Sequence, residues 1–295
     1  MLLQVIEQRR KNLGDFEVGR VLPAAGQRMV GPFVFLDHIG PVDLPAGLAR
    51  SADVRPHPHI GLSTVTYLFD GEIVHRDSVG STQPIHPGEV NWMVAGSGIT
   101  HSERFEKARA QGDMLHGIQS WVALPKEDEE VAPSFAHYAC RALPEQSAGG
   151  VWMRVIAGEA HGLRSPVTVH SPQFYVHVRL AAGAKIQLPD QYAERAAYVV
   201  TGEVQADGAL FHAGQLLVFK SGPGATVKAV TEAMLMLLGG EPVGPRFIDW
   251  NFVSSSRERI EQAKADWRAG RMKLPDADHD EFIPLPDSDA SPRSG

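Results

Sequence analysis

Glycine and proline break this chain into short apolar runs, which restricts it to folds built from many short strands. The 295 residues include 29 Gly and 21 Pro, scattered rather than gathered in one tract. Runs of this length, rich in valine, isoleucine and aromatic residues and bounded by turn residues, are typical of β-strands. Their number predicts an all-β protein of the barrel or sandwich type. The clearest runs are Phe33–Leu36, Thr64–Phe69, Val90–Val94, Phe174–Val178, Ala197–Val200 and Gln215–Phe219.

The runs fall into two groups of similar layout, which predicts two copies of one plan. The length exceeds that of a usual single domain, and a hydrophobic fraction of 43% supplies two substantial cores. We expect the joint between Ala142 and Gly150, where Pro, Gln, Ser and a Gly pair interrupt the apolar runs. The expected domains are therefore residues 1–141 and residues 142–295.

Two turn signals and one helix signal stand out. Asp70-Gly71 and Thr201-Gly202-Glu203 each separate two apolar runs and predict β-hairpins. A helix is expected after Ser254-Ser255-Ser256, which can supply its cap. Ile260 and Trp267 recur there at helical spacing, and we expect them to pack on the second barrel.

Charge and cysteine content exclude several classes of protein. A net charge of −7 and a pI near 6.0 argue against direct binding to nucleic-acid phosphates, but not against a protein partner. The single cysteine, Cys140, excludes an internal disulfide and a cysteine-built zinc site. The sequence contains neither a membrane-length apolar stretch nor a secretory signal, so we expect a cytoplasmic monomer. The acidic end, Asp287–Gly295, is expected to be disordered.

Two short patterns carry side chains that bind metals. The first is His57-Pro58-His59. The second, His101-Ser102-Glu103, begins 44 positions after His57 and lies in the same half of the chain. Side chains two apart on a strand point to the same face, so each pair aims two donors in one direction. Imidazole and carboxylate suit divalent ions such as iron, manganese, cobalt, nickel or zinc. Because Pro58 cannot donate to a strand ladder, the first pattern is expected on an edge strand or strand end.

A His-x-His pattern alone is weak evidence in a chain with 13 histidines. His75 and His116 lie in the same half and remain candidates for the site. Four others have no partner at comparable spacing and are expected to be structural: His86, His161, His170 and His279.

Four separated segments of the first half have distinctive sequences: Pro32–His38, Arg55–Gly61, Pro87–Met93 and Gly98–Glu103. Their layout resembles the two motifs of cupins and, more closely, the pirin family. Ser165-Pro166-Val167 and the helix near the carboxy terminus also resemble the second half of pirins, so the resemblance spans nearly the whole chain.

This resemblance implies a bicupin, in which two cupin-type β-barrel (jelly-roll) domains pack face to face and a short helix lies near the carboxy terminus. It implies one divalent metal in the first barrel and a second barrel that lacks metal ligands. Fe(II) is the expected ion, and Mn, Co, Ni, Cu and Zn remain open. Cupins usually carry a glutamate shortly after the His pair, where this chain has Ser63 and Thr64. The implied ligands are His57, His59, His101 and Glu103.

The resemblance also implies quercetin 2,3-dioxygenase activity, with a flavonol and O2 as substrates. Glu103 is then either a fixed ligand or the base that takes the flavonol proton. One alternative is a metal-dependent regulator that binds a transcription factor or a metabolic enzyme. A second alternative is a related enzyme that acts on a different substrate. A third is that the bound metal, for example zinc, has a purely structural role. The apolar residues near the ligands are candidates for the pocket lining: Phe35, Val65, Met93 and Phe105.

Overall fold

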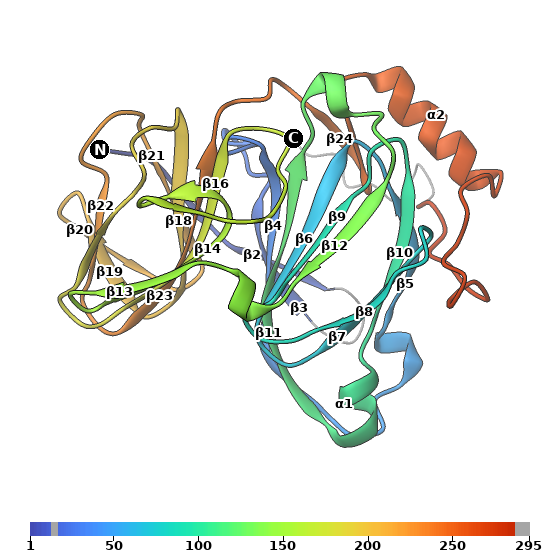
Figure 1. The fold of residues 1–295 in the computed structure, drawn as a ribbon, viewed down its shortest axis with the longest axis horizontal. Helices are drawn as coiled ribbons and strands as arrows, with labels where there is room; N and C mark the ends of the chain where they lie inside the picture. Colours follow the sequence, from blue (N-terminus) through green and yellow to red (C-terminus); the bar gives the residue numbers. More distant parts are fainter. Residues whose placement is uncertain (13–16, 287–295) are drawn as a thin grey trace.

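A computed structural model describes residues 1–12 and 17–286, so the disorder predicted for residues 287–295 lies outside the described part. The chain forms two β-barrel halves that lie side by side (Figure 1), and each half combines a large sheet with a four-stranded one. This confirms the predicted all-β bicupin. No helix in the described ranges is long and apolar enough to cross a membrane.

The first barrel is antiparallel throughout and holds a seven-stranded and a four-stranded sheet. The large sheet runs in the order β12 (Ser134–Tyr138), β9 (Val90–Val94), β6 (Leu62–Asp70), β11 (Asp113–Ala123), β4 (Phe33–Leu44), β3 (Glu17–Leu22) and β2 (Arg9–Asn12). The small sheet runs β5 (Val54–His59), β10 (Ile99–Arg104), β7 (Ile73–Asp77) and β8 (Thr82–Ile85), and α1 (Glu106–Gln111) follows β10.

The second barrel repeats this plan with an eight-stranded and a four-stranded sheet. The large sheet runs β1 (Leu2–Glu7), β21 (Gln215–Phe219), β18 (Glu194–Thr201), β23 (Ala233–Gly240), β16 (Gln173–Leu180), β14 (Val151–Ala160) and β13 (Glu145–Ala148), and β15 (Leu163–Arg164) pairs with β14. The small sheet runs β17 (Lys185–Gln187), β22 (Thr226–Ala229), β19 (Glu203–Ala206) and β20 (Ala209–His212).

The two large sheets bury one face against each other. Val65 and Tyr67 of β6 share a core with Tyr175 of β16 and Tyr198 of β18, because alternate side chains of each strand point toward the opposite barrel. The interior of the second barrel is filled by a separate cluster of apolar side chains. The two histidine patterns lie on strands β5 and β10 of the first barrel.

The two predicted hairpins are wrong, although both turns exist. Gly71 (φ +88°) ends β6, and Gly202 (φ +83°) ends β18. In each case the next strand joins the small sheet instead of pairing with its predecessor. A Cβ at Gly71 would lie 2.3 Å from the Met114 carbonyl oxygen, so this sharp corner between sheets requires glycine. Both turns occupy equivalent places in the two barrels.

Two segments cross the expected division at residues 141 and 142. The first strand, β1, pairs with β21 in the large sheet of the second barrel. In the other direction, β24 (Phe247–Asp249), β25 (Phe252–Ser254) and α2 (Arg257–Arg268) return to the first barrel, where Phe252 bridges to Ile60. The division of the chain into residues 1–141 and 142–295 therefore stays a proposal.

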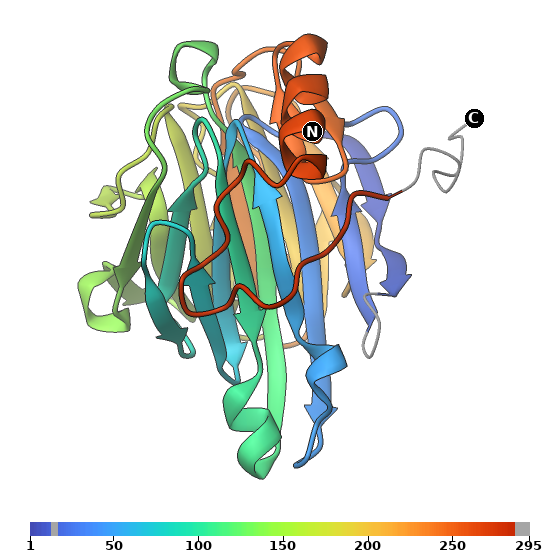
Figure 2. The same cartoon turned by 90° about the vertical axis from the view of Figure 1, so that its right-hand side faces the viewer.

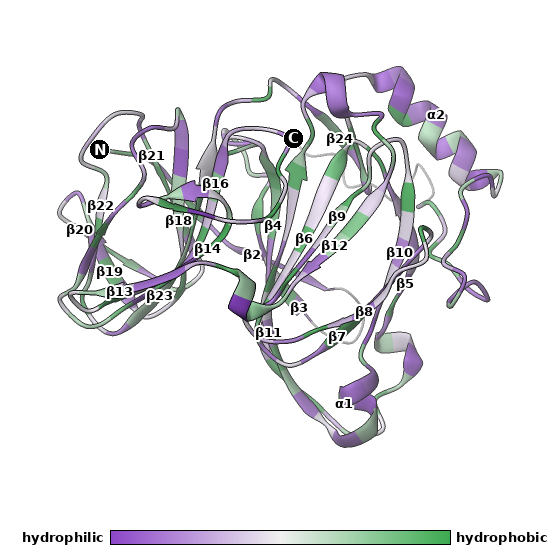
Figure 3. Cartoon of the chain, viewed as in Figure 1, coloured by the Kyte–Doolittle hydropathy of each residue, from purple (hydrophilic) through white to green (hydrophobic). Residues whose placement is uncertain are grey.

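Helix α2 begins at the predicted cap, since the Ser256 hydroxyl accepts a hydrogen bond from the Arg259 amide. Its expected packing on the second barrel is wrong. Ile260 and Trp267 pack in one cluster with Ile60 of the first barrel, because the β24–β25 hairpin carries the chain back before the helix begins. The helix shows hydrophilic and hydrophobic positions in Figure 3, as expected for one buried face.

Candidate metal centre

Strands β5 and β10 bring the two histidine patterns together. They pair antiparallel, with His101 opposite His57 and Ile99 opposite His59. As predicted from Pro58, β5 is an edge strand of its sheet. One ligand atom from each of His57, His59 and His101 lies within 4.8 Å of the others, and all three side chains are buried. Within residues 1–12 and 17–286, this is the one group of three or more metal-binding side chains so arranged.

Each of the three rings has its Nδ1 atom engaged away from the centre. His57 Nδ1 lies 2.9 Å from the carbonyl oxygen of Arg55, and His59 Nδ1 lies 3.0 Å from that of Asn251. His101 Nδ1 faces another histidine ring. These contacts leave Nε2 as the free donor atom, and Nε2 of His101 is buried without a hydrogen-bond partner in the described structure. Such an orphaned donor fits a metal ion.

Burial keeps these imidazoles neutral. Desolvation lowers the pKa of His57 to about 4, and it lowers the pKa of His59 and His101 well below the ordinary value. The neighbouring histidines add to the effect in each case. Because a metal binds the neutral ring, the three side chains are in the protonation state that a divalent ion requires.

Glu103 lies in the same pocket but outside the three-histidine group. The β5–β10 register shifts between His101 and Glu103, where β5 has one residue more than β10, whereas the pairing of β10 with β7 stays regular. Burial raises the pKa of Glu103 to about 7. The expected four-ligand set thus divides into three convergent histidines and one carboxylate beside them.

The histidines open into a pocket of about 450 Å³, within the range of small-molecule sites. Phe35 and Trp121 form part of its wall and stack 4.0 Å apart at 13°. Phe105 also lines the pocket, whereas Val65 lies in the interface between the barrels. Met93 is not in the lining but packs in the same apolar cluster as Phe35 and Trp121. A larger groove of about 1040 Å³ beside residues 164–173 contains none of the three histidines.

A polar pair occupies another part of the pocket wall. Arg20 donates two hydrogen bonds of 2.8 Å to the Asp37 carboxylate, and its guanidinium lies over the Phe35 ring. Burial raises the pKa of Asp37 although Arg20 opposes the shift. The pair was not predicted from the sequence, and it gives the mainly apolar pocket one side that can form hydrogen bonds with a ligand.

Of the two histidines that remained candidates, His75 reaches the centre and His116 does not. His75 Nδ1 lies 3.4 Å from His101 Nδ1, while its Nε2 lies 2.8 Å from Asp77 Oδ2. His116 lies at the interface between the barrels, 2.9 Å from His38. Asp77 was missed, although its spacing of two from His75 on one strand is the same signal that identified His57 and His59.

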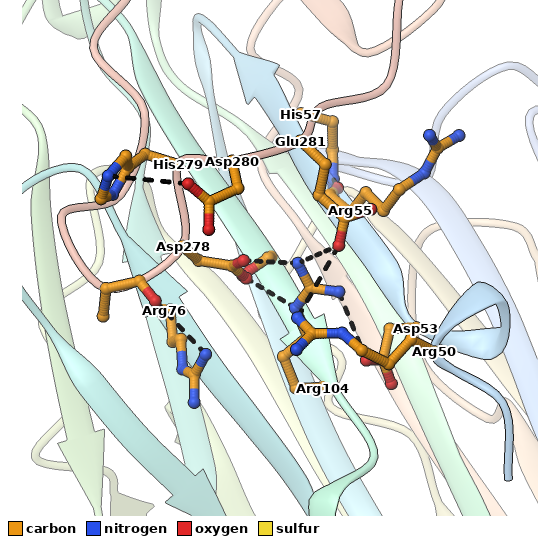
Figure 4. A network of polar contacts seen from close by, with 12 residues as sticks. Arg50, Asp53, Arg55, His57, Arg76, Arg104, Asp278, His279, Asp280 and Glu281 are labelled. Atoms are coloured by element: carbon orange, nitrogen blue, oxygen red, sulfur yellow. Dashed lines mark hydrogen bonds and ion pairs between the residues drawn. The ribbon is translucent and has the colours of Figure 1, made fainter.

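The carboxy-terminal segment covers the outer face of the strands that carry the site. In Figure 2 it crosses in front of the first barrel as the dark red chain after α2. The Ile283 amide donates to the Pro56 carbonyl, and Ile283 lines the pocket. Buried Arg104, next to Glu103, forms ion pairs with Asp53, Asp278 and Glu281 (Figure 4). A His-x-Glu triplet in the second half, ending at Glu281, thus belongs to this segment and not to a second metal site.

The fold and site together define a bicupin with a histidine-rich centre in its first barrel. Comparison with protein families matches residues 15–122 to the pirin family and residues 175–273 to the pirin C-terminal cupin domain. The chain belongs to the pirin family, as the sequence motifs predicted.

Relatives and solved structures agree with this assignment. A pirin-like protein of Caulobacter vibrioides is 62% identical over 288 residues, which cover 97% of this chain and all of that protein. The crystal structure of quercetin 2,3-dioxygenase from Acinetobacter baumannii is 32% identical, with a TM-score of 0.89, and the match covers 99% of this chain and 97% of that one. The bacterial pirin YhhW of Escherichia coli, solved with nickel(II), shares the fold at 18% identity, with a TM-score of 0.63 and coverage of 81% and 99%.

Proposed function

We propose that this protein is a metal-dependent quercetin 2,3-dioxygenase. The reaction opens the central ring of a flavonol with O2, places both oxygen atoms in a phenolic ester and releases carbon monoxide. The observation that carries the proposal is the convergence of three neutral imidazoles on a pocket with a stacked aromatic wall. The similarity to the Acinetobacter baumannii quercetin 2,3-dioxygenase supports the same activity.

In this proposal His57, His59 and His101 would hold one divalent ion of the iron class, with Glu103 as the fourth candidate ligand. Histidine and carboxylate donors suit Fe(II), with Mn, Co, Ni, Cu and Zn as alternatives. The bound ion lowers the pKa of a hydroxyl group that coordinates it, which favours the flavonol anion.

The chain's own residues supply binding and proton transfer. Phe35 and Trp121 line the pocket beside His59, whose ring lies 5.1 Å from Trp121, and a planar flavonol would pack against this aromatic wall. Glu103, whose pKa burial raises to about 7, would act as the base that accepts the hydroxyl proton of the substrate. The Arg20–Asp37 pair is placed to bind phenolic hydroxyls on the pocket wall.

The test combines metal analysis with two quercetin measurements. The purified protein is assayed for metals, mixed with quercetin without oxygen, and then exposed to air while carbon monoxide is measured. We expect near-stoichiometric metal, a shifted flavonol spectrum before oxygen is added, and carbon monoxide afterwards. His101→Ala should lose all three, and His212→Ala, at an exposed position of the second barrel, should keep them.

The outcomes separate the alternatives. Metal without a spectral shift or carbon monoxide would contradict the flavonol reaction and leave the regulatory role or another substrate. In that case, a pull-down comparing metal-loaded with metal-free protein tests the regulatory role. Failure to bind any divalent metal after reconstitution would contradict the site itself.

A further inference from the structure

Three buried side chains form a line that leads away from the candidate metal centre. His101 Nδ1 lies 3.4 Å from His75 Nδ1, and His75 Nε2 lies 2.8 Å from Asp77 Oδ2. The other carboxylate oxygen of Asp77 accepts hydrogen bonds from the amides of Val79 (3.0 Å) and Ser81 (2.9 Å). Exposed fractions of 1%, 5% and 1% show that His101, His75 and Asp77 are all buried from bulk solvent.

The strand pairing keeps the line in place. On β10 and β7, His101 lies opposite Asp77 and Glu103 lies opposite His75. The ring of His75 stacks on Phe135, with centroids 4.4 Å apart at 14°. Backbone amides anchor one end of the line and ring stacking holds its middle, so the contacts between the three side chains have little freedom to rearrange.

The positions of the ring protons on His75 and His101 follow from Asp77, the end of the line that backbone amides hold in place. Imidazole is a stronger base than carboxylate, so the shared proton lies on His75 Nε2 and points at Asp77. When the His75 ring carries only that proton, its Nδ1 is bare and can only accept a hydrogen bond. His101 must donate to it from Nδ1, and its own Nε2 is left bare and facing the pocket.

We propose that Asp77 and His75 are positioning residues that fix the tautomer of His101 and thereby the affinity of this site for a divalent metal. The inference rests on the site of the proposed function but not on the flavonol reaction. Groups that orient metal-binding histidines in this way typically change metal affinity 10- to 100-fold when they are replaced.

Asp77→Asn is the decisive substitution because it preserves shape. The amides of Val79 and Ser81 require the Asn oxygen on their side, so the Asn NH2 group faces His75 Nε2 and drives its proton to Nδ1. His101 can then no longer donate from Nδ1, and its proton moves to the atom that should bind the metal. We expect cobalt(II) to bind about 10- to 100-fold more weakly in a chelator competition.

Two further measurements make the test specific. In metal-free wild-type protein, ¹⁵N NMR of the histidine rings should place the proton on Nε2 of His75 and on Nδ1 of His101. In a His75→Phe background, which keeps the stack on Phe135, Asp77→Asn should weaken cobalt(II) binding no further. Asp43→Asn, on the exposed part of β4, is the matched control and should leave the affinity unchanged.

Three results would overturn the inference. The first is a cobalt(II) affinity of Asp77→Asn within threefold of wild type. The second is a loss of affinity on Asp77→Asn that is as large in the His75→Phe background as in wild type. The third is a wild-type NMR spectrum with the His75 proton on Nδ1. The last needs no variant and decides the matter even if Asp77→Asn does not fold. The expected tautomers and affinity loss, found without any flavonol turnover, would support this inference and contradict only the proposed function.

Discussion

Arg104 donates two hydrogen bonds of 2.6 Å to the carboxylate of Asp278, which lies 174 positions later in the chain. Both side chains are buried. The pair joins the carboxy-terminal segment to the strand that carries His101 and Glu103, so the segment and the site form one structural unit (Figure 4).

Asp278→Asn should lower the free energy of unfolding by about 3 kcal/mol at neutral pH, because it leaves the buried Arg104 undercompensated. Burial raises the pKa of Asp278, but the contacts with Arg104 and Ser102 outweigh it and hold that pKa below the ordinary value. The stabilisation is therefore present above about pH 4 and is lost as the pH falls through the lowered pKa. Denaturant unfolding of the two metal-free proteins measures this effect. The difference in free energy of unfolding between wild type and Asp278→Asn should become smaller below about pH 4.

The exposed pair of Asp249 and Lys264, 2.8 Å apart, provides the control. Asp249→Asn should change the free energy of unfolding by no more than about 0.5 kcal/mol at either pH. A loss in Asp278→Asn as small as this would contradict the role given to the buried pair.

Glu103→Gln should stabilise the metal-free protein above neutral pH and should greatly reduce the turnover of quercetin. The raised pKa, about 7, means that ionising Glu103 destabilises the fold once the pH rises from the ordinary glutamate value through the folded one. At about pH 8 the metal-free variant should be more stable than metal-free wild type by about 2 to 3 kcal/mol, and the two should coincide near pH 4. Turnover of quercetin should fall about 100-fold or more.

The metal content of Glu103→Gln tests its second role. Loss of metal together with turnover would favour a fixed ligand, and retained metal with lost turnover would favour the base. A variant as unstable as wild type at pH 8 would show that the carboxyl group is better solvated than its buried position indicates.

Trp121→Leu should weaken quercetin binding about three- to tenfold, because it removes the ring that stacks on Phe35 at the pocket wall. Spectral titration without oxygen measures the dissociation constant, and metal analysis checks that the centre remains filled. Phe211→Leu, in the core of the second barrel, removes an aromatic ring of the same kind far from the pocket and should leave quercetin binding unchanged.

Removing the metal should lower the unfolding temperature of wild type, and adding metal should raise that temperature as the metal concentration increases. A metal at 100 times its dissociation constant adds about 2.7 kcal/mol to the free energy of unfolding. Thermal unfolding with increasing cobalt(II) should show a rising midpoint in wild type and in His212→Ala, and no rise in His101→Ala. An identical rise in His101→Ala would place the metal elsewhere.

The sequence predicted the parts of this molecule that depend on local pattern. Strand-forming runs, the helix cap and the two separate metal-binding patterns follow from short-range spacing, whereas the grouping of His57, His59 and His101 followed from the resemblance to pirins. What it could not supply were contacts between distant segments, such as the return of Trp267 to the first barrel. The hairpins failed for the same reason, since Asp70-Gly71 specifies a sharp turn but not which sheet the next strand joins.

Asp77 shows the limit at the site itself. A histidine and a carboxylate two apart occur often by chance, and only the pairing of β7 with β10 gives this pair a role. Glu103 is the opposite case. Strict alternation predicts it beside His101, yet the convergent group contains only the three histidines.

The pairing of β1 with β21 also bears on how this protein is made in a cell. The ribosome releases Leu2–Glu7 well before its partner strand, Gln215–Phe219, which emerges more than 200 residues later. The segment from β24 to Glu281 closes over the first barrel only after the strands of the second barrel have been made. Neither barrel is therefore complete before residues of the other have been made, and a gene fragment cut between them would encode two products that each lack a part made by the other.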